Sequence, residues 1–246
     1  MTTPFETALK KKHVVIVGGG SGMGKSTAEL AAGLGARVTI SSRDPDKLKR
    51  AADGIDGAVS VAPVDMSDEA GVRAWAAALG SVDHLVISAS SAAHGGFAEL
   101  PTADLRAMFE AKFTGPYVTA REVLPYLNDG ASITLFSGVL SRRPSAGATG
   151  LGAVNAAVEA LTKGLAQELA GKARVNCISP GLVATEAYAG MPEAAREEMF
   201  AQVGASLPVG RVGRAEEIAQ AVIMAMSNPF LTGAVLDVDG GHLVKA

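Results

Sequence analysis

A glycine-rich turn between a strand-like and a helix-like segment is the feature that most constrains the fold of this chain. The apolar run His13–Val17 leads into residues 18–24, five of which are glycine. Turns of this kind let backbone N–H groups and the start of a helix meet a phosphate, because no Cβ blocks the approach. The segment therefore predicts a nucleotide-binding turn at the carboxyl end of the first strand.

This turn fits two patterns of nucleotide recognition. Residues 19–26 fit the P-loop pattern GxxxxGK[ST], in which Lys25 would reach the terminal phosphates and Ser26 would hold magnesium. Residues 18–24 also fit the spacing GxxxGxG, which is used in dinucleotide turns. Taken alone, the turn leaves both interpretations open.

Apolar segments of strand length alternate with segments of helical periodicity along the whole chain. This alternation predicts an α/β fold: one Rossmann-like domain with a doubly wound parallel sheet and helices on both faces. A small helical insertion is expected near 185–208, where it would cover a substrate. The predicted strands are His13–Val17, Arg37–Ser41, Ala58–Val64, His84–Ala89, Ser132–Ser137, Arg174–Ile178 and Ala234–Val238, and the predicted helices are Gly22–Leu34, Pro45–Ala52, Asp68–Leu79, Thr102–Leu127, Thr149–Leu169 and Ala215–Met226.

Composition limits the partners that we expect. The chain has 246 residues, of which 48% are hydrophobic, and a net charge of −3. Such a chain can bury one sizeable core, and it carries no basic surface for nucleic acid or an anionic membrane. Cys177 is the single cysteine, and we find no signal-peptide pattern and no apolar run long enough to span a membrane. We expect a cytoplasmic protein.

Further motifs follow the glycine turn in a characteristic order. They are Asp65 after the third predicted strand, Arg174-Val175-Asn176 leading to Pro180-Gly181, Gly210-Arg211-Val212-Gly213 before Glu216-Glu217-Ile218-Ala219, and Val238-Asp239-Gly240-Gly241. In this order, over nearly the whole length, the chain resembles the classical short-chain dehydrogenase/reductase family. The resemblance favours a dinucleotide turn over a P-loop.

The end of the second predicted strand distinguishes the two nicotinamide dinucleotides. A carboxylate there would accept a hydrogen bond from the adenosine ribose and repel a 2′-phosphate. This chain has Ser42 at the position where NAD-specific relatives carry aspartate, and Arg43 can pair with a phosphate. Asp44 followed by Pro45 is typical of a helix N-cap. We therefore expect NADP(H) as the cofactor.

The resemblance also implies a set of cofactor-binding residues. These are Gly18, Gly20, Ser21, Gly22, Met23, Gly24, Ser42, Arg43, Asp65, Met66, Ala89, Ser90, Pro180, Gly181, Val183 and Thr185.

The residues at the family's catalytic positions are unusual. The resemblance places Leu151 where the family has its proton-donating tyrosine, Asn155 at the lysine, and Gly138 at the serine, just after Ser137. It places Lys112 at the family's asparagine, so lysine and asparagine have exchanged positions. Leucine cannot exchange a proton. Our hypothesis is an atypical relay in which Lys112, Ser137 and Asn155 are the catalytic residues, with Lys112 as the proton donor.

Three functions remain open on the sequence. The first is an NADP(H)-dependent oxidoreductase that acts on a carbonyl or alcohol, and the second is a catalytically inactive NADP(H)-binding sensor or partner subunit. The third, resting on the turn alone, is a P-loop nucleotide hydrolase. Arg142 and Arg143 hint at an anionic small-molecule substrate. By resemblance, the helices at 102–127 and 149–169 would pack against partner subunits in a homodimer or homotetramer.

Overall fold

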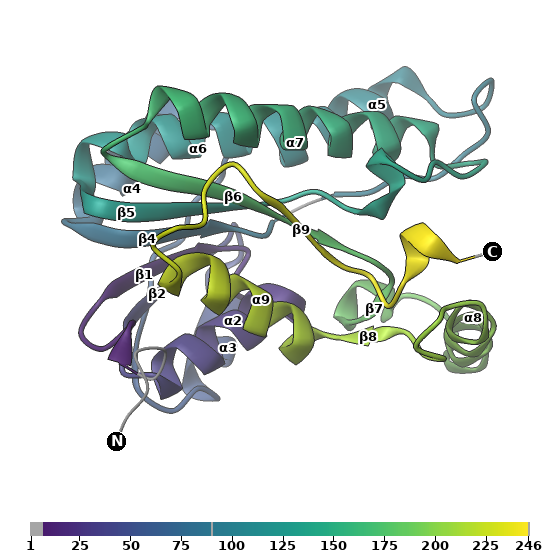
Figure 1. Cartoon of the computed structure of the whole chain (residues 1–246), viewed down its shortest axis with the longest axis horizontal. Coiled ribbons are helices and arrows are strands. Elements are labelled where there is room, and N and C mark those ends of the chain that lie inside the picture. The colour runs from purple at the N-terminus through teal and green to yellow at the C-terminus, as the bar shows by residue number, and fades with distance from the viewer. Residues whose placement is uncertain (1–6, 90, 246) are drawn as a thin grey trace.

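A seven-stranded sheet forms the centre of the protein (Figure 1). The computed structural model describes residues 7–89 and 91–245. The strand order is β3-β2-β1-β4-β5-β6-β9, and every neighbouring pair is parallel. The predicted single-domain, Rossmann-like fold is confirmed. The strands of this sheet are β1 (His13–Val17), β2 (Arg37–Ser41), β3 (Ala58–Val61), β4 (Val82–Ile87), β5 (Leu127–Phe136), β6 (Ala173–Pro180) and β9 (Val235–Val238).

Helices cover both faces of the sheet. In Figure 1, α2, α3 and α9 lie below it and α5, α6 and α7 lie above it. None of the helices in the described part of the chain is long and apolar enough to cross a membrane. The helices are α2 (Gly22–Gly33), α3 (Pro45–Asp53), α4 (Glu69–Leu79), α5 (Thr102–Phe109), α6 (Gly115–Val123), α7 (Thr149–Glu168), α8 (Glu193–Ala205) and α9 (Ala215–Ser227), with short helical turns η1 (Glu110–Thr114), η2 (Leu124–Tyr126), η3 (Val139–Ser141), η4 (Glu186–Tyr188) and η5 (His242–Val244).

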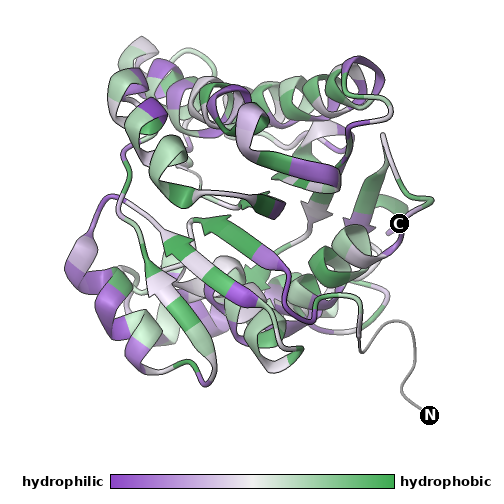
Figure 2. Ribbon diagram, turned by 90° about the vertical axis from the view of Figure 1, so that its left-hand side faces the viewer, coloured by the Kyte–Doolittle hydropathy of each residue, from purple (hydrophilic) through white to green (hydrophobic). Residues whose placement is uncertain are grey.

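Strand β1 shows why the central strands are apolar at nearly every position. Val14 and Ile16 belong to the core between the sheet and helices α2, α3 and α9. Val15 and Val17 belong to the core between the sheet and helices α4, α6 and α7. Successive side chains of a strand point to opposite faces, so a strand covered on both faces needs no polar alternation. Figure 2 shows hydrophobic strands running between the two helical layers.

The connection order creates a crevice at one edge of the sheet. From β1 the chain passes outward to β2 and β3, then returns to β4 on the other side of β1. The loops after β1 and β4 therefore leave the sheet in opposite directions. In doubly wound folds, ligands bind at this switch point, beyond the carboxyl ends of the strands.

The long helix predicted for Thr102–Leu127 is wrong in its interior and at its end. The structure has α5, a π-helical turn η1, α6 and the 3₁₀ turn η2, and Leu127 already belongs to β5. Pro116 has no N–H, so it cannot donate the α-helical hydrogen bond to the carbonyl of Lys112. The widened turn is a consequence of that missing donor.

Two short strands frame the segment between β6 and α9. β7 (Val183–Ala184) pairs in parallel with β8 (Gly213–Arg214), and both are too short to give a sequence pattern. Between them lie η4 and α8, within the predicted insertion. Gly204 is the only buried residue of α8, which lies at one end of the molecule, away from the sheet (Figure 1).

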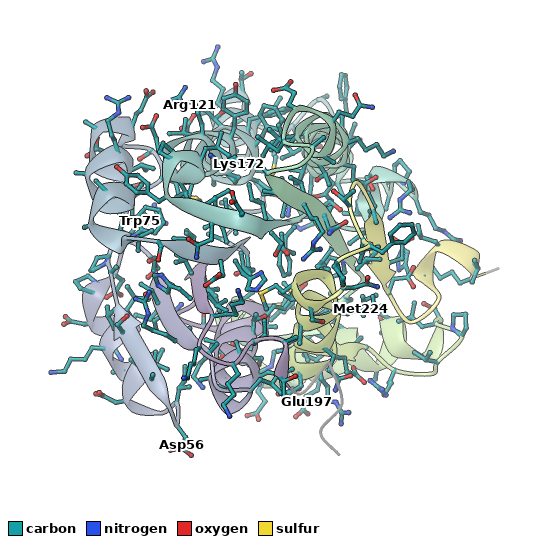
Figure 3. The ribbon with its side chains drawn as sticks, turned by 60° about the vertical axis from the view of Figure 1, so that its left-hand side comes forward. Asp56, Trp75, Arg121, Lys172, Glu197 and Met224 are labelled. Carbon is teal, nitrogen blue, oxygen red and sulfur yellow. The ribbon has the colours of Figure 1, made fainter. Side chains whose placement is uncertain are left out.

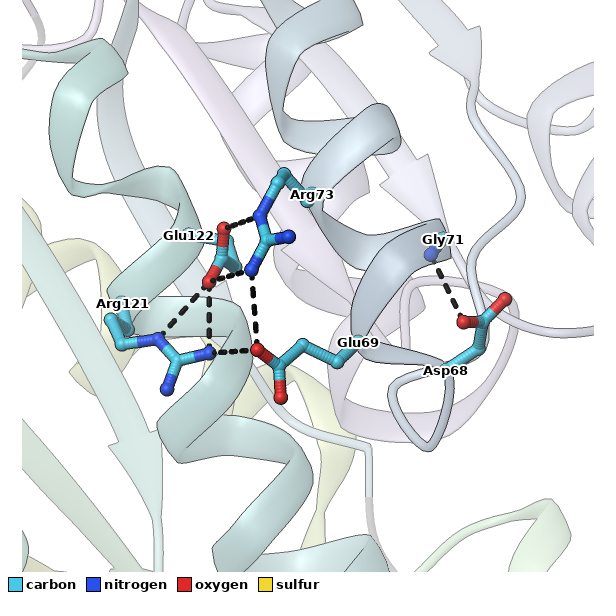
Figure 4. Close-up of polar contacts among 6 residues, drawn as sticks. All are labelled: Asp68, Glu69, Gly71, Arg73, Arg121 and Glu122. Atoms are coloured by element: carbon cyan, nitrogen blue, oxygen red, sulfur yellow. Dashed lines mark hydrogen bonds and ion pairs between the residues drawn. The ribbon is translucent and has the colours of Figure 1, made fainter.

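A network of ion pairs joins α4 to α6 at the surface (Figure 4). Arg73 Nε on α4 donates to Glu122 of α6 at 2.9 Å, and Arg121 of α6 donates to Glu69 of α4 at 2.7 Å. Each arginine thus bridges carboxylates on both helices. Because the four charged side chains form one connected network, they restrain the two helices more than isolated surface pairs would.

Candidate functional site

The glycine turn after β1 is packed so closely that two positions accept only glycine. A Cβ on Gly18, where φ is +91°, would lie 2.5 Å from the backbone nitrogen of Ala89 after β4. A Cβ on Gly24 would lie 2.2 Å from the carbonyl oxygen of Gly18. The turn therefore brings the positive end of α2 to the crevice between β1 and β4.

A groove of about 530 Å³ opens at this crevice. Its size is that of a cofactor or small-molecule site. Most of the predicted cofactor residues line it: Gly18, Gly20, Ser21, Gly22, Met23, Gly24, Ser42, Arg43, Asp65, Met66, Ala89 and Thr185. The sequence analysis missed several polar lining residues, namely Lys47, Ser67, Ser88, Ser91, Glu110 and Glu186.

The groove carries positive charge and no carboxylate where β2 ends. Ser42 and Arg43 line the groove there, and Arg43 is exposed. Asp44 does not compete for the site, because its side chain accepts a hydrogen bond from the Lys47 backbone N–H at 2.9 Å and caps α3. The predicted N-cap is confirmed. Lys47, in the first turn of α3, adds a second cation to this end of the groove.

Asp65, which follows β3, also lines the groove, and its carboxylate is held in place. Its Oδ1 accepts hydrogen bonds from the backbone N–H and the hydroxyl of Ser67, at 3.0 and 2.8 Å. These bonds lower the pKa of Asp65. A fixed carboxylate of this kind suits hydrogen-bond recognition of a ring edge.

Three predicted cofactor residues, Pro180, Gly181 and Val183, do not line the groove. Pro180 ends β6 and is buried, and Val183 is buried in β7. A Cβ on Gly181 would lie 2.9 Å from the backbone of Asp239, so glycine lets the two segments approach. They position the segment that carries Thr185 into the groove. Ser90 lies outside the described residues.

The geometry does not support the P-loop interpretation. Lys25 Nζ forms an ion pair with Glu29 one turn further along α2. Lys25 and Ser26 line a second cavity, beside α8, and not the groove. The lysine of a P-loop would instead face the phosphates in the groove.

Lys112 is buried in the π-helical turn η1, with 7% of its surface exposed. Its Nζ donates to the main-chain carbonyl of Ser137 at 3.1 Å. Burial lowers the pKa of Lys112 to about 8. Desolvation disfavours the charged form, so the ammonium can release a proton near neutral pH. Its neighbour Ala111 lines the groove, but Lys112 itself does not.

Asn155 faces the same interior from α7. It is 2% exposed, and its Oδ1 has no hydrogen-bond partner among the described residues. A Cβ on Gly138 would lie 3.0 Å from Asn155 Nδ2. The structure thus brings Lys112, Ser137 and Asn155 to one interior region between β5 and α7.

Glu159 is a half-buried partner of Ser137 that the sequence analysis missed. Its Oε1 accepts hydrogen bonds from the hydroxyls of Ser137 and Ser141, at 3.1 and 2.5 Å. The Ser137 hydroxyl therefore points toward α7. Glu159 lies one helical turn after Asn155, so the signal for it was the spacing of polar residues on one face of the helix.

Arg142 and Arg143 both bind groups of the protein itself. Arg142 pairs with Asp237 of β9 and also donates to the Ser179 hydroxyl at 3.0 Å. Arg143 donates to the main-chain carbonyls of His242 and Lys245, at 2.9 and 2.6 Å. Both guanidinium groups hold the C-terminal segment against the end of β5.

Comparison with known proteins identifies the family of this chain. A family model described as enoyl-(acyl carrier protein) reductase matches residues 18–242. The chain is 31% identical to 3-oxoacyl-[acyl-carrier-protein] reductase FabG of Thermotoga maritima, over 96% of this chain and 99% of that protein. It is 32% identical to cis-4-hydroxycyclohexanecarboxylate dehydrogenase of Sinomonas cyclohexanicum, over 96% and 98%.

A solved structure is similar over the same range. The crystal structure of a small-chain dehydrogenase in complex with NADPH is 39% identical, has a TM-score of 0.82, and aligns over 95% of this chain and 99% of that chain. The chain belongs to the classical short-chain dehydrogenase/reductase family. Sequence and fold thus agree on an oxidoreductase family.

Two further residues stand where the family resemblance places its catalytic serine and tyrosine. Gly138 lies in the turn between β5 and η3, and Leu151 lies half-buried in the first turn of α7. Neither side chain can donate a proton. Among the described residues of this short-chain dehydrogenase/reductase, the ionisable groups around Ser137 include Lys112, Glu159 and the Cys177 thiol, and Arg142 lies 3.7 Å from Glu159.

Proposed function

We propose that the chain is an NADP(H)-dependent oxidoreductase that interconverts a carbonyl and an alcohol on a small molecule. The groove supports this proposal, since its glycine turn, helix start and cationic β2 end suit the pyrophosphate and 2′-phosphate of the dinucleotide. The relative of known structure that binds NADPH adds to it. When bound, the reduced nicotinamide supplies the hydride.

In this proposal Lys112 Nζ donates the proton that the reduced carbonyl oxygen takes up. The observation that carries the proposal is the buried ammonium of Lys112, which adjoins Ala111 in the groove wall. Burial lowers the pKa of this ammonium to about 8. Ser137 holds the amine through its carbonyl. Asn155 Oδ1, which has no partner among the described residues, would accept a hydrogen bond from the nicotinamide ribose.

Substitution of Lys112 tests this role. We expect Lys112→Met to lower kcat about 100-fold or more, because general acid catalysis contributes that much. Its NADPH affinity and its circular dichroism spectrum should stay close to those of the wild type. The substrate panel would include a 3-oxoacyl thioester and cis-4-hydroxycyclohexanecarboxylate, which the names of two relatives indicate. Unchanged turnover in Lys112→Met would contradict the proposal.

The second candidate function is a catalytically inactive NADP(H)-binding sensor or partner subunit. It is favoured by the burial of Lys112, Ser137 and Asn155, which are 7%, 5% and 2% exposed and do not line the groove. Calorimetry with NADPH, NADH and Mg-ATP, followed by the carbonyl panel, separates the candidates. NADPH binding without turnover of any carbonyl would favour the sensor.

We also infer a homo-oligomer in the cytoplasm. A small cavity of about 190 Å³ beside α6 and α7 is lined mostly by apolar residues, among them Leu124, Leu161, Leu165 and Tyr117, which is 43% exposed, and also by Arg121 and Glu168. Such a surface suits burial against a second copy of the chain. The single cysteine, Cys177, is buried and free, which suits a reducing compartment.

A further inference from the structure

The first helix after the glycine turn is capped by a residue from far along the chain. Glu186 Oε2 accepts a hydrogen bond from the backbone N–H of Gly22, the first residue of α2, at 2.8 Å. The helix offers no such group of its own, since Ser21 makes no side-chain capping bond and the first turn contains no acidic residue. The carboxylate of Glu186 therefore serves as the anion at the positive end of α2.

This N–H lies at the place where a dinucleotide would bind. Gly22 lines the groove within the glycine turn, where the start of α2 would bind the pyrophosphate. A carboxylate and a phosphate oxygen cannot share one N–H donor, and two anions at one helix end repel each other. Glu186 must leave Gly22 before the pyrophosphate can occupy the site.

A second cavity offers the carboxylate another position. It measures about 630 Å³, and Gly22, Thr185 and Glu186 line both this cavity and the groove. Its other walls carry three cations, Lys25, Arg196 and Arg214, and two carboxylates, Glu29 and Glu216. Lys25 is paired with Glu29 and Arg214 with Glu217, whereas half-buried Arg196 of α8 has no side-chain partner among the described residues.

Movement of Glu186 would be transmitted to α8. Glu186 begins η4, and Tyr188 at the end of that turn packs edge-to-face on Phe200 of α8, with ring centroids 5.4 Å apart. Because Gly204 is the only buried residue of α8, the helix can shift without opening a large apolar contact. A carboxylate that turns toward Arg196 would draw η4 and α8 together.

We propose that Glu186 is an internal competitor of the cofactor and couples cofactor binding to the position of α8. In the free protein its carboxylate occupies the anion site at Gly22. When the pyrophosphate takes that site, Glu186 pairs with Arg196 and fixes the position of α8 at the second cavity. This inference rests on the proposed NADP(H) binding.

Calorimetric titration of the full chain with NADPH tests the competition. Glu186→Gln removes the competing charge, so we expect its dissociation constant to fall about tenfold, as one charge at a helix terminus allows. Arg196→Gln should bind NADPH more weakly than the wild type, because the displaced carboxylate loses its partner. In the double variant the Arg196 substitution should have no further effect.

Hydrogen exchange of α8 provides the second readout. NADPH should increase the protection of α8 amides in the wild type and leave it unchanged in Glu186→Gln. Glu197→Gln, an exposed position on α8 (Figure 3), is the matched control and should behave as the wild type. Wild-type binding with an unchanged constant in Glu186→Gln would overturn this inference alone, and absence of NADPH binding in every variant would overturn the proposed function with it.

Discussion

His84 is the residue whose protonation the fold opposes most clearly. It lies in β4 with Nδ1 2.8 Å from the Ser132 hydroxyl, and burial lowers its pKa to about 4. In the unfolded chain the histidine has its ordinary pKa of about 6.5. Between about pH 4 and 6.5 the unfolded chain therefore binds a proton at His84 that the folded protein does not bind. The contribution of neutral His84 to the free energy of unfolding is therefore fully present above pH 6.5. It is lost as the pH falls toward 4, which lowers the free energy of unfolding by about 3 kcal/mol.

Urea unfolding at pH 7, 5.5 and 4.5 measures this dependence. Burial also lowers the pKa of His13, so His84→Gln should flatten the curve without abolishing its slope. The glutamine keeps a polar partner for Ser132 but does not titrate. A curve for His84→Gln as steep as that of the wild type would show that other groups cause the acid sensitivity.

At this same scale, the sequence predicted what depends on residue identity and missed what depends on contact geometry. Only glycine fits at Gly18 and Gly24, so spacing alone located the turn. The bond from Lys112 to the Ser137 carbonyl involves a main-chain atom, which every residue has, and no pattern indicates it. Glu159 was missed because a carboxylate on α7 has an ordinary interpretation as a solvent-facing group.

The start of α4 shows how a single side chain determines where an element begins. Asp68 accepts a hydrogen bond from the backbone N–H of Gly71 at 3.1 Å (Figure 4), and this satisfies one of the otherwise free donors at the helix start. We expect Asp68→Ala to lower the free energy of unfolding by about 1 kcal/mol. Asp68→Asn keeps an acceptor oxygen and should stay close to the wild type. Equal losses in both variants would argue against the capping role.

Elements were predictable where periodicity ran without interruption. The predicted bounds of β1 and β2 agree with the structure, because four consecutive apolar residues define β1 and the buried Val38 and Ile40 define β2. The region 102–126 also has helical periodicity, but Pro116 removes one backbone donor and the chain widens into η1. β7 and β8 contain two residues each and are defined by their pairing alone, so they lie below what periodicity can detect.

At the scale of the whole molecule, the proposed homo-oligomer would form through the face of α6 and α7. Gly164 lies on α7 within the lining of the small, mostly apolar cavity of this face, and a Cβ there would meet nothing within 4 Å. Glycine inside a helix costs about 0.5–1 kcal/mol relative to alanine, so this position is unfavourable for a single subunit. A smooth surface at Gly164 is instead favourable if another helix packs closely on it.

We therefore predict that Gly164→Arg leaves the fold intact and separates the subunits. The monomer has open space for the new side chain and gains helix propensity, so its circular dichroism spectrum should match that of the wild type. The apolar cavity beside it would no longer seat a second copy, because a charged side chain would be buried in the contact. Light scattering after gel filtration should show a dimer or tetramer for the wild type and a monomer for Gly164→Arg. Gly33→Arg, at another helix position where a Cβ meets nothing, should remain oligomeric. If both variants keep the wild-type mass, the subunits associate through a different face or not at all.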